Sequence, residues 1–180
     1  MTEKKTFIKR LIYITILIFV CFLLQTSVFS NLELAGVTPN FLIIIVSTFG
    51  FMRGRKEGLF VGFFCGLLLD FFFGYYLGLF ALVYMYVGYM NGFFKKIFFG
   101  DDIKLPLILI GSSDLIYGLL IYVCMFLFRE QYSFGFYFFQ VILPEIVYTI
   151  VVAIPVYFII LKMNQRLEKN EKRSTRRLVE

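Results

Sequence analysis

The sequence contains no histidine and no tryptophan, and only three cysteines and four prolines among its 180 residues. Without histidine, neither a Ser-His nor a Cys-His catalytic pair can form. Without tryptophan, any aromatic belt at a membrane interface must be built from the 12 tyrosines and 25 phenylalanines. We therefore expect no catalytic residues of the hydrolase type and no cofactor.

The three cysteines, Cys21, Cys65 and Cys124, each lie inside an apolar run. There is no CxxC pair, and no histidine could complete a metal site with them. A cysteine in such a setting usually packs as a small apolar side chain. We predict free thiols here, with no metal site and no structural disulfide.

Hydrophobic residues make up 60% of the chain, compared with roughly 45–50% in a soluble domain. They are arranged in blocks, and a helix needs about 20 apolar residues to cross the hydrocarbon core of a bilayer. The blocks predict an all-α integral membrane protein with six transmembrane helices in a compact bundle. The predicted spans are Leu11–Phe29, Pro39–Met52, Glu57–Phe73, Leu77–Phe94, Leu105–Phe128 and Phe134–Leu161.

The second run is short, and its start is predicted from Thr38 as the N-cap and Pro39 in the first turn. The basic groups that precede and follow it support a crossing, because both favour the cytoplasmic side. The chain must then cross outward and return between Arg10 and Arg53.

Positive charge gathers in four short segments between the runs. Residues 1–10, 53–56, 95–104 and 162–180 hold 17 of the 18 Lys and Arg residues, and Arg129 is the remaining one. Because basic residues are retained on the cytoplasmic side, this distribution predicts that both termini are cytoplasmic. We expect a multi-pass protein of the cytoplasmic (inner) membrane of a bacterium.

The segments outside the spans are too short to fold as separate domains. We divide the chain into a basic cytoplasmic tail (1–10), a six-span membrane domain (11–161) and a charged cytoplasmic tail (162–180), which we expect to continue the sixth helix. The net charge of +6 is spread over membrane-flanking pieces. It therefore favours contact with anionic membrane lipid over nucleic acid.

Glycines recur every four residues in the third span and share one helix face with an aspartate, Asp70. In lipid, small residues at this spacing allow the backbone of a neighbouring helix to approach closely. We therefore predict that spans two to four form the tightly packed centre. The predicted helix-packing stripe comprises Gly58, Gly62, Gly66, Gly74, Gly78, Gly88 and Gly92.

Three acidic residues fall within the predicted spans: Asp70, Asp114 and Glu145. A charged aspartate at the centre of a span costs about 2.5–3.5 kcal/mol on insertion scales. Asp70 also lies near the C-terminus of its helix, where the helix dipole disfavours a negative charge. We expect all three to face the bundle interior, either as functional groups or as polar contacts between helices.

The run Gly62-Phe63-Phe64-Cys65-Gly66-Leu67-Leu68-Leu69-Asp70, followed by Gly74 and Gly78-Leu79, resembles the central signature of the MreD family of rod shape-determining membrane proteins. The preceding Pro39-Asn40, Gly54 and Gly58 are similar to that family's layout, as are the length and the predicted six spans. The residue-level resemblance covers about 39–92 and does not reach Asp114 or Glu145.

The resemblance implies a non-enzymatic component of the cell-elongation machinery that supports lateral-wall peptidoglycan synthesis. The implied partners are a bitopic MreC-like protein, an MreB-like cytoskeleton, and the glycan polymerase and transpeptidase of the elongation complex. It also implies a fold similar to the substrate-binding membrane subunits of energy-coupling-factor vitamin transporters.

Two other function classes are weighed against this one. A small-molecule-binding transporter subunit would place its site between helices near the outer face, with Asp70, Tyr75, Asn91 and Asp114 as the available polar groups. An intramembrane aspartyl protease would need Asp70 and Asp114 to share a proton. The motifs expected to flank such a pair are absent.

Overall fold

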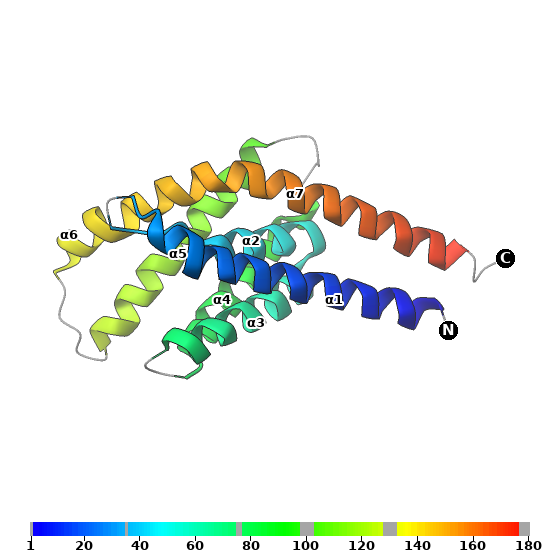
Figure 1. Cartoon of the computed structure of the whole chain (residues 1–180), viewed down its shortest axis with the longest axis horizontal. Helices are drawn as coiled ribbons and strands as arrows, with labels where there is room; N and C mark the ends of the chain where they lie inside the picture. The colour runs from blue at the N-terminus through cyan, green and yellow to red at the C-terminus, as the bar shows by residue number, and fades with distance from the viewer. Residues whose placement is uncertain (1, 35, 75–76, 98–102, 128–132, 177–180) are drawn as a thin grey trace.

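The computed structural model describes residues 2–34, 36–74, 77–97, 103–127 and 133–176, with side chains described over 8–124 and 133–169 of these ranges. These residues form an all-helical bundle (Figure 1). Its helices are α1 (Thr2–Leu23), α2 (Phe41–Arg53), α3 (Arg55–Phe73), α4 (Leu79–Asn91), α5 (Lys104–Leu127), α6 (Phe134–Tyr137) and α7 (Leu143–Arg176).

Three helical segments are long and apolar enough to cross a membrane: Ile8–Asn31, Lys104–Cys124 and Phe134–Lys169. The helix Phe41–Arg53 is apolar but shorter. The six predicted runs correspond in order to six helical segments within the described residues. The helical fold is therefore confirmed, whereas six crossings with both termini inside stay a prediction.

The helices do not begin and end where the predicted membrane spans do. The first helix begins at Thr2 and continues past Leu23 through a π-helical turn, Leu24–Val28, and a 3-10 turn, Phe29–Asn31. The fourth ends at Asn91 and is followed by a 3-10 turn, Gly92–Lys96. Apolar runs predict where a helix lies in the membrane, but helices continue into the polar region on either side.

The sixth helical segment is long, and its α-helical geometry is interrupted by one π-helical turn. A π-helical turn, Phe138–Ile142, joins α6 to α7. Helix α7 then continues through Pro155 to Arg176. The expected continuation of the sixth helix into the charged tail is therefore confirmed as far as Arg176. Figure 1 shows α7 and α1 projecting together at the end of the molecule where both termini lie.

The predicted start of the second helix is wrong. The N-cap is Asn40 and not Thr38, and the helix begins at Phe41. The Asn40 side chain accepts a hydrogen bond from the Ile43 amide at 3.1 Å. Asparagine caps a helix N-terminus better than threonine does, and here it stands two residues closer to the apolar run.

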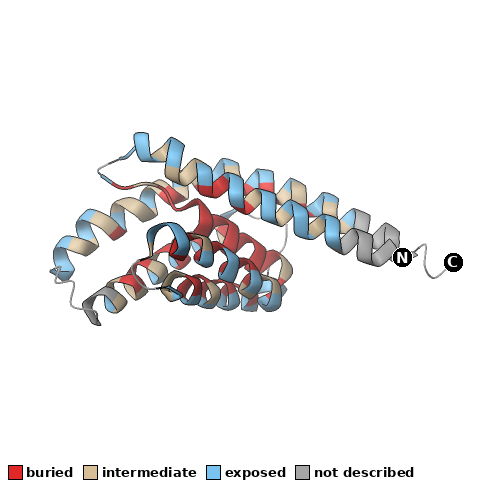
Figure 2. Ribbon diagram, turned by 60° about the horizontal axis from the view of Figure 1, so that its bottom comes forward, coloured by how far each residue is buried: buried red, intermediate tan, exposed pale blue. Residues whose placement is uncertain are grey.

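Helix α2 is the centre of the bundle. Every residue from Phe41 to Met52 is buried, and α1, α3, α4, α5 and α7 all pack against it. Figure 2 shows buried positions concentrated around this helix, with exposed positions on the outer helices. An apolar helix surrounded by protein need not match the thickness of the bilayer, which explains how a 13-residue helix is accommodated.

The outer surface of the bundle is apolar. On α3, the face opposite the glycines presents Phe60, Phe64, Leu67 and Phe71 to the exterior, with Phe71 79% exposed. Exposed apolar side chains of this size also line α1, α5 and α7. A soluble protein rarely exposes so much contiguous apolar surface. We infer that these faces contact lipid or other membrane helices.

Helices α3 and α4 make the closest contact in the structure. A methyl group placed on Gly58, Gly62 or Gly66 would overlap the α4 backbone at Gly88, Tyr84 and Phe80–Ala81, respectively. Gly88 of α4 faces Gly58, and Gly92, in the 3-10 turn after α4, lies against the backbone of Arg55. The two helices therefore touch backbone to backbone along their length.

Gly74 and Gly78 lie outside this contact, contrary to the predicted stripe. Gly74 ends α3, where its amide donates to the Asp70 carbonyl at 3.1 Å. Gly78 precedes α4 with a φ of 98°, and a methyl group placed on it would meet no described atom within 4 Å. Gly78 has a positive φ, which glycine adopts without strain. The four-residue period of glycines therefore continues past the end of α3 without contributing to the helix contact.

Substituting Gly62 or Gly66 with alanine should destabilise the bundle by about 1–3 kcal/mol, because the added methyl group meets backbone that cannot move aside. Leucine at either position should prevent folding. The test is thermal unfolding of purified protein in mild detergent.

The matched control is Gly135→Ala, because a methyl group there meets no described atom within 4 Å. The close approach of α3 and α4 would be contradicted if the Gly62 and Gly66 variants unfolded at the same temperature as the unmodified protein. It would also be contradicted if Gly135→Ala lowered the unfolding temperature as much as they do.

Candidate functional site

Asp70 is buried in the last turn of α3, with only 1% of its surface exposed. Its two carboxylate oxygens accept hydrogen bonds from the first turn of α4. Oδ1 accepts from the Phe80 amide at 2.9 Å, and Oδ2 accepts from the Ala81 amide at 2.8 Å. A carboxylate bound in this way is both hydrogen-bonded and placed at the positive end of a helix dipole.

Neighbouring residues explain why Asp70 takes this role. Helix α4 has no side-chain cap of its own, because Gly78 stands at its N-cap position. The close packing of Gly66 against Phe80 and Ala81 brings the free amides of α4 to the carboxylate one turn later on α3. Asp70 thus acts as an N-cap supplied by the preceding helix. This arrangement offsets the unfavourable dipole at the C-terminus of α3.

A second polar group of residues surrounds Asn40, the N-cap of α2. The backbone amide of Asn40 donates to Thr149 Oγ1 of α7 at 3.0 Å. The side-chain oxygen of Asn40, Oδ1, accepts from the Tyr84 hydroxyl of α4 at 2.8 Å. All three residues are buried. Asn40 therefore connects α2, α4 and α7 in the middle of the bundle.

Asp114 of α5 and Glu145 of α7 belong to the same cluster. Asp114 is 2% exposed, and both its carboxylate oxygens are buried without a hydrogen-bond partner among the described residues. The side chains of Asn40 and Thr149 interact with it, and Glu145 interacts with both Asp114 and Asn40. Glu145 is partly exposed and lies one helical turn before Thr149 on the same face. We name Asn40, Tyr84, Asp114, Glu145 and Thr149 the carboxyl cluster.

Helix geometry is irregular beside the carboxyl cluster. The π-helical turn Phe138–Ile142 ends three residues before Glu145, and Ile142 packs against Gly118 of α5. The turn Leu24–Val28 contains Gln25, which accepts a hydrogen bond from the Leu42 amide at 3.3 Å. Turns of π-helix are rare and are often found at functional sites.

The three predicted acids therefore lie in two places. Asp70 is bound by α4, whereas Asp114 and Glu145 share the carboxyl cluster. Asp70 and Asp114 have separate partners, so they do not form the dyad that an aspartyl protease needs. Among the other polar residues weighed for a ligand site, Asn91 donates to Ser113 of α5 at 2.7 Å. Tyr75 lies outside the described residues.

Sequence reasoning missed Asn40, Tyr84 and Thr149 as a group. Asn40 carries a detectable signal, since an asparagine directly before an apolar helical run is a strong N-cap candidate. Tyr84 and Thr149 carry none, because a single polar side chain in an apolar run does not show which helix it faces.

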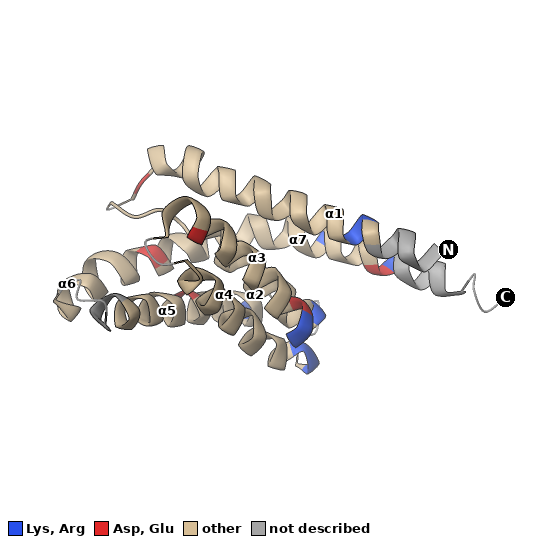
Figure 3. Ribbon diagram, turned by 90° about the horizontal axis from the view of Figure 1, so that it is seen from below, with Lys and Arg blue, Asp and Glu red and all other residues tan. Residues whose placement is uncertain are grey.

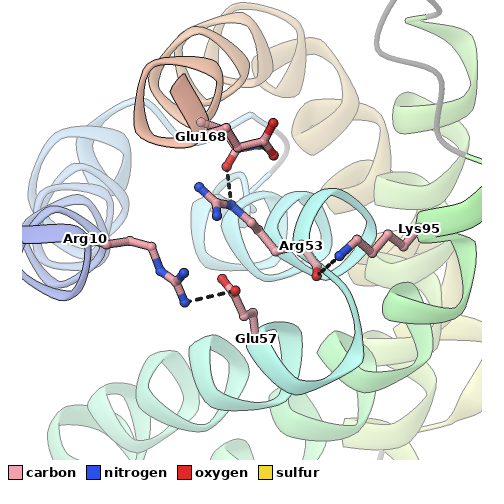
Figure 4. A network of polar contacts seen from close by, with 6 residues as sticks. Arg10, Arg53, Glu57, Lys95 and Glu168 are labelled. Atoms are coloured by element: carbon pink, nitrogen blue, oxygen red, sulfur yellow. Dashed lines mark hydrogen bonds and ion pairs between the residues drawn. The ribbon is translucent and has the colours of Figure 1, made fainter. Parts of the chain in front are cut away.

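A third polar network lies at the end of the bundle that carries both termini, which we call the basic end. Figure 3 shows most Lys and Arg residues toward this end. Arg10 of α1 pairs with Glu57 of α3 at 2.9 Å, and Lys95 donates to the Arg53 carbonyl at 2.7 Å (Figure 4). Arg53 also bonds Asn164 of α7. These contacts join α1, α2, α3 and α7 where the apolar helices end.

The described residues contain no group of three or more His, Cys, Asp or Glu side chains that could hold a metal ion. Cys21 and Cys65 are buried free thiols, and Cys124 is a partly buried one. Chemically, the described polar groups can cap helices and join them.

Replacing Asp70 with alanine should destabilise the protein by about 1–3 kcal/mol, because one buried and one partly buried amide of α4 lose their acceptor. Asp70→Asn should have a smaller effect, since one oxygen remains to accept. Hydrogen exchange of the Phe80 and Ala81 amides measures the effect directly and should accelerate in Asp70→Ala.

Glu33→Ala is a suitable control, because Glu33 is an exposed acid outside the α3–α4 contact. Unchanged exchange at Phe80 and Ala81 in the Asp70 variants would show that Asp70 does not cap α4.

Comparison with known proteins gives one match. No curated protein and no solved structure matches the chain. A family model described as rod shape-determining protein MreD matches residues 5–167, which include most of α1, all of α2 to α5 and the part of α7 that carries Glu145 and Thr149. The chain belongs to the MreD family of rod shape-determining proteins.

Proposed function

We propose that this rod shape-determining membrane protein is a non-enzymatic adaptor of the cell-elongation machinery. In this role it supports lateral-wall peptidoglycan synthesis by holding membrane partners through helix–helix contacts. The proposed partners are a bitopic MreC-like protein, the glycan polymerase and transpeptidase of the elongation complex, and, directly or through them, an MreB-like cytoskeleton.

The family match over residues 5–167 is the observation that carries this proposal. The outer surface supports it. Helix α1 buries only a small part of its apolar length, and α3 presents a row of phenylalanines to the exterior. Such faces suit partners that are themselves transmembrane helices, because recognition in lipid depends on side-chain packing.

We further propose the division into tails 1–10 and 162–180 around a six-span membrane domain, 11–161, with both termini in the cytoplasm. The domain would lie in the inner membrane of a bacterium and adopt a bundle like that of energy-coupling-factor substrate-binding subunits. The gathering of most described Lys and Arg residues at the basic end supports this orientation (Figure 3).

The proposed orientation predicts the accessibility of two single cysteines placed in a chain whose Cys21, Cys65 and Cys124 are replaced by alanine. Ser30 is exposed between α1 and α2, on the side that the proposal places outside the cell. Lys96 is exposed at the basic end. A membrane-impermeant maleimide should label Ser30→Cys in intact spheroplasts, and Lys96→Cys only after permeabilisation. The reverse pattern would exclude cytoplasmic termini.

The adaptor role predicts what the tagged protein retains when it is purified from its native membrane in mild detergent. Mass spectrometry should identify an MreC-like protein, with or without the polymerase and transpeptidase. Substituting alanine for two exposed phenylalanines of α3, Phe60 and Phe64, should reduce this recovery without lowering the unfolding temperature. The same substitution at Phe139, which is exposed in the turn between α6 and α7, serves as the control.

A substrate-binding subunit of a vitamin-type transporter is the alternative, and the carboxyl cluster is the observation that favours it. The same purification separates the two functions. Recovery of paired ATPases and a coupling membrane subunit in place of an MreC-like protein would contradict the adaptor role. Ligand-induced thermal stabilisation would then identify the transported compound.

A further inference from the structure

The carboxyl groups of Asp114 on α5 and Glu145 on α7 lie close enough to interact, and two negative charges there would need a compensating positive charge. Asp114 and Glu145 interact with each other and share Asn40 as a neutral neighbour. No Lys or Arg is among the groups whose charge acts on either acid in the described part of the chain. Two adjacent carboxylates with no cation strongly repel each other in a medium of low dielectric constant.

The space around Asp114 limits what can supply that positive charge. Both carboxylate oxygens are inaccessible to a water-sized probe and lack a hydrogen-bond donor at bonding distance within the described chain. A metal ion or an organic cation would need room beside these oxygens. A proton needs none, because it is bound covalently to one oxygen and can be shared with the facing carboxyl group.

The other groups that face the pair are neutral or oriented to stabilise a single negative charge. Tyr84 of α4 and Tyr117 of α5 are the titratable neighbours, and Tyr137 of α6 stands beside Tyr117. From α2 the cluster receives Asn40 and the positive end of a helix dipole. Thr149 of α7 contributes a hydroxyl group. This environment suits one carboxylate and one protonated carboxyl.

We propose that Asp114 and Glu145 form a proton-binding site that holds one proton between α5 and α7. The two carboxyl groups share this proton and one negative charge, and both Asp114 oxygens are buried without a hydrogen bond from the described residues. Glu145 is partly exposed and provides the route by which the proton exchanges. This inference is independent of the proposed adaptor function.

Proton binding joins the two halves of the bundle. Helices α2, α3 and α4 pack closely on one side, and α5 and α7 pack together on the other. The carboxyl cluster lies where these halves meet, because Asn40 bonds to α4 and α7 and interacts with Asp114 of α5. Loss of the proton would place two negative charges at this junction and drive α5 and α7 apart.

Infrared spectroscopy of the full chain in lipid nanodiscs tests the site directly, since a protonated carboxyl group absorbs apart from carboxylates and amides. At neutral pH the unmodified protein should show this band. The band should be lost in Asp114→Asn. It should be strongly reduced in Glu145→Gln, because a neutral neighbour removes the repulsion that retains the proton. Glu33→Gln, at an exposed acid, should leave it unchanged.

Three outcomes would overturn the proposal. The first is absence of a protonated carboxyl band at neutral pH. The second is a band that persists in Asp114→Asn or in Glu145→Gln. The third is failure of Asp114→Asn to fold, because asparagine has the shape and neutrality of the protonated side chain and should be tolerated.

Discussion

The backbone contact between α3 and α4 determines where the polar groups of this protein can lie. Gly58, Gly62 and Gly66 leave no room for a side chain between the two helices. This close spacing brings the backbone amides of Phe80 and Ala81 within hydrogen-bonding distance of the Asp70 carboxylate. In lipid there is no water to satisfy these groups, so the glycines and the aspartate depend on one another. The same contact fixes Tyr84, whose hydroxyl group reaches Asn40.

Polar contacts within the bundle are arranged at three depths. Asp70 joins α3 to α4 near one end, the carboxyl cluster joins α2, α4, α5 and α7 in the middle, and the Arg10–Glu57 pair is part of the network at the basic end. Apolar packing alone discriminates weakly between neighbours in a membrane, because lipid tails are as apolar as the side chains. The polar contacts therefore specify which helices pair, while the outer apolar faces remain available to partners.

Periodicity and charge made much of the fold predictable from the sequence. The four-residue spacing of Gly58, Gly62 and Gly66 indicated a close helix contact, and the apolar blocks gave the order of the helices. The same spacing also misled, because Gly74 and Gly78 continue it after α3 has ended. The carboxyl cluster was not predictable. Asp114 and Glu145 are 31 residues apart, and their encounter depends on how α5 and α7 rotate about their axes, which a local pattern does not encode.

The family signature and the polar contacts coincide only in part. Asp70 and its glycines lie within the region that resembles other MreD proteins, and they have a structural explanation in the capping of α4. Asp114 and Glu145 lie outside that region, yet both are buried or partly buried where four helices meet. The family match over residues 5–167 nevertheless includes both acids.

Helix α7 has a mechanical property that follows from its length and from Pro155. Its 34 residues correspond to about 51 Å at about 1.5 Å per residue, well beyond a hydrocarbon core of about 30 Å. A continuous helix of that length acts as a lever, so a small change of tilt near Glu145 displaces its far end by a larger distance. Pro155 removes one backbone hydrogen bond and makes that point the easiest place to bend. Pro155 therefore lies between the segment held at the carboxyl cluster and the segment held by Arg53 through Asn164.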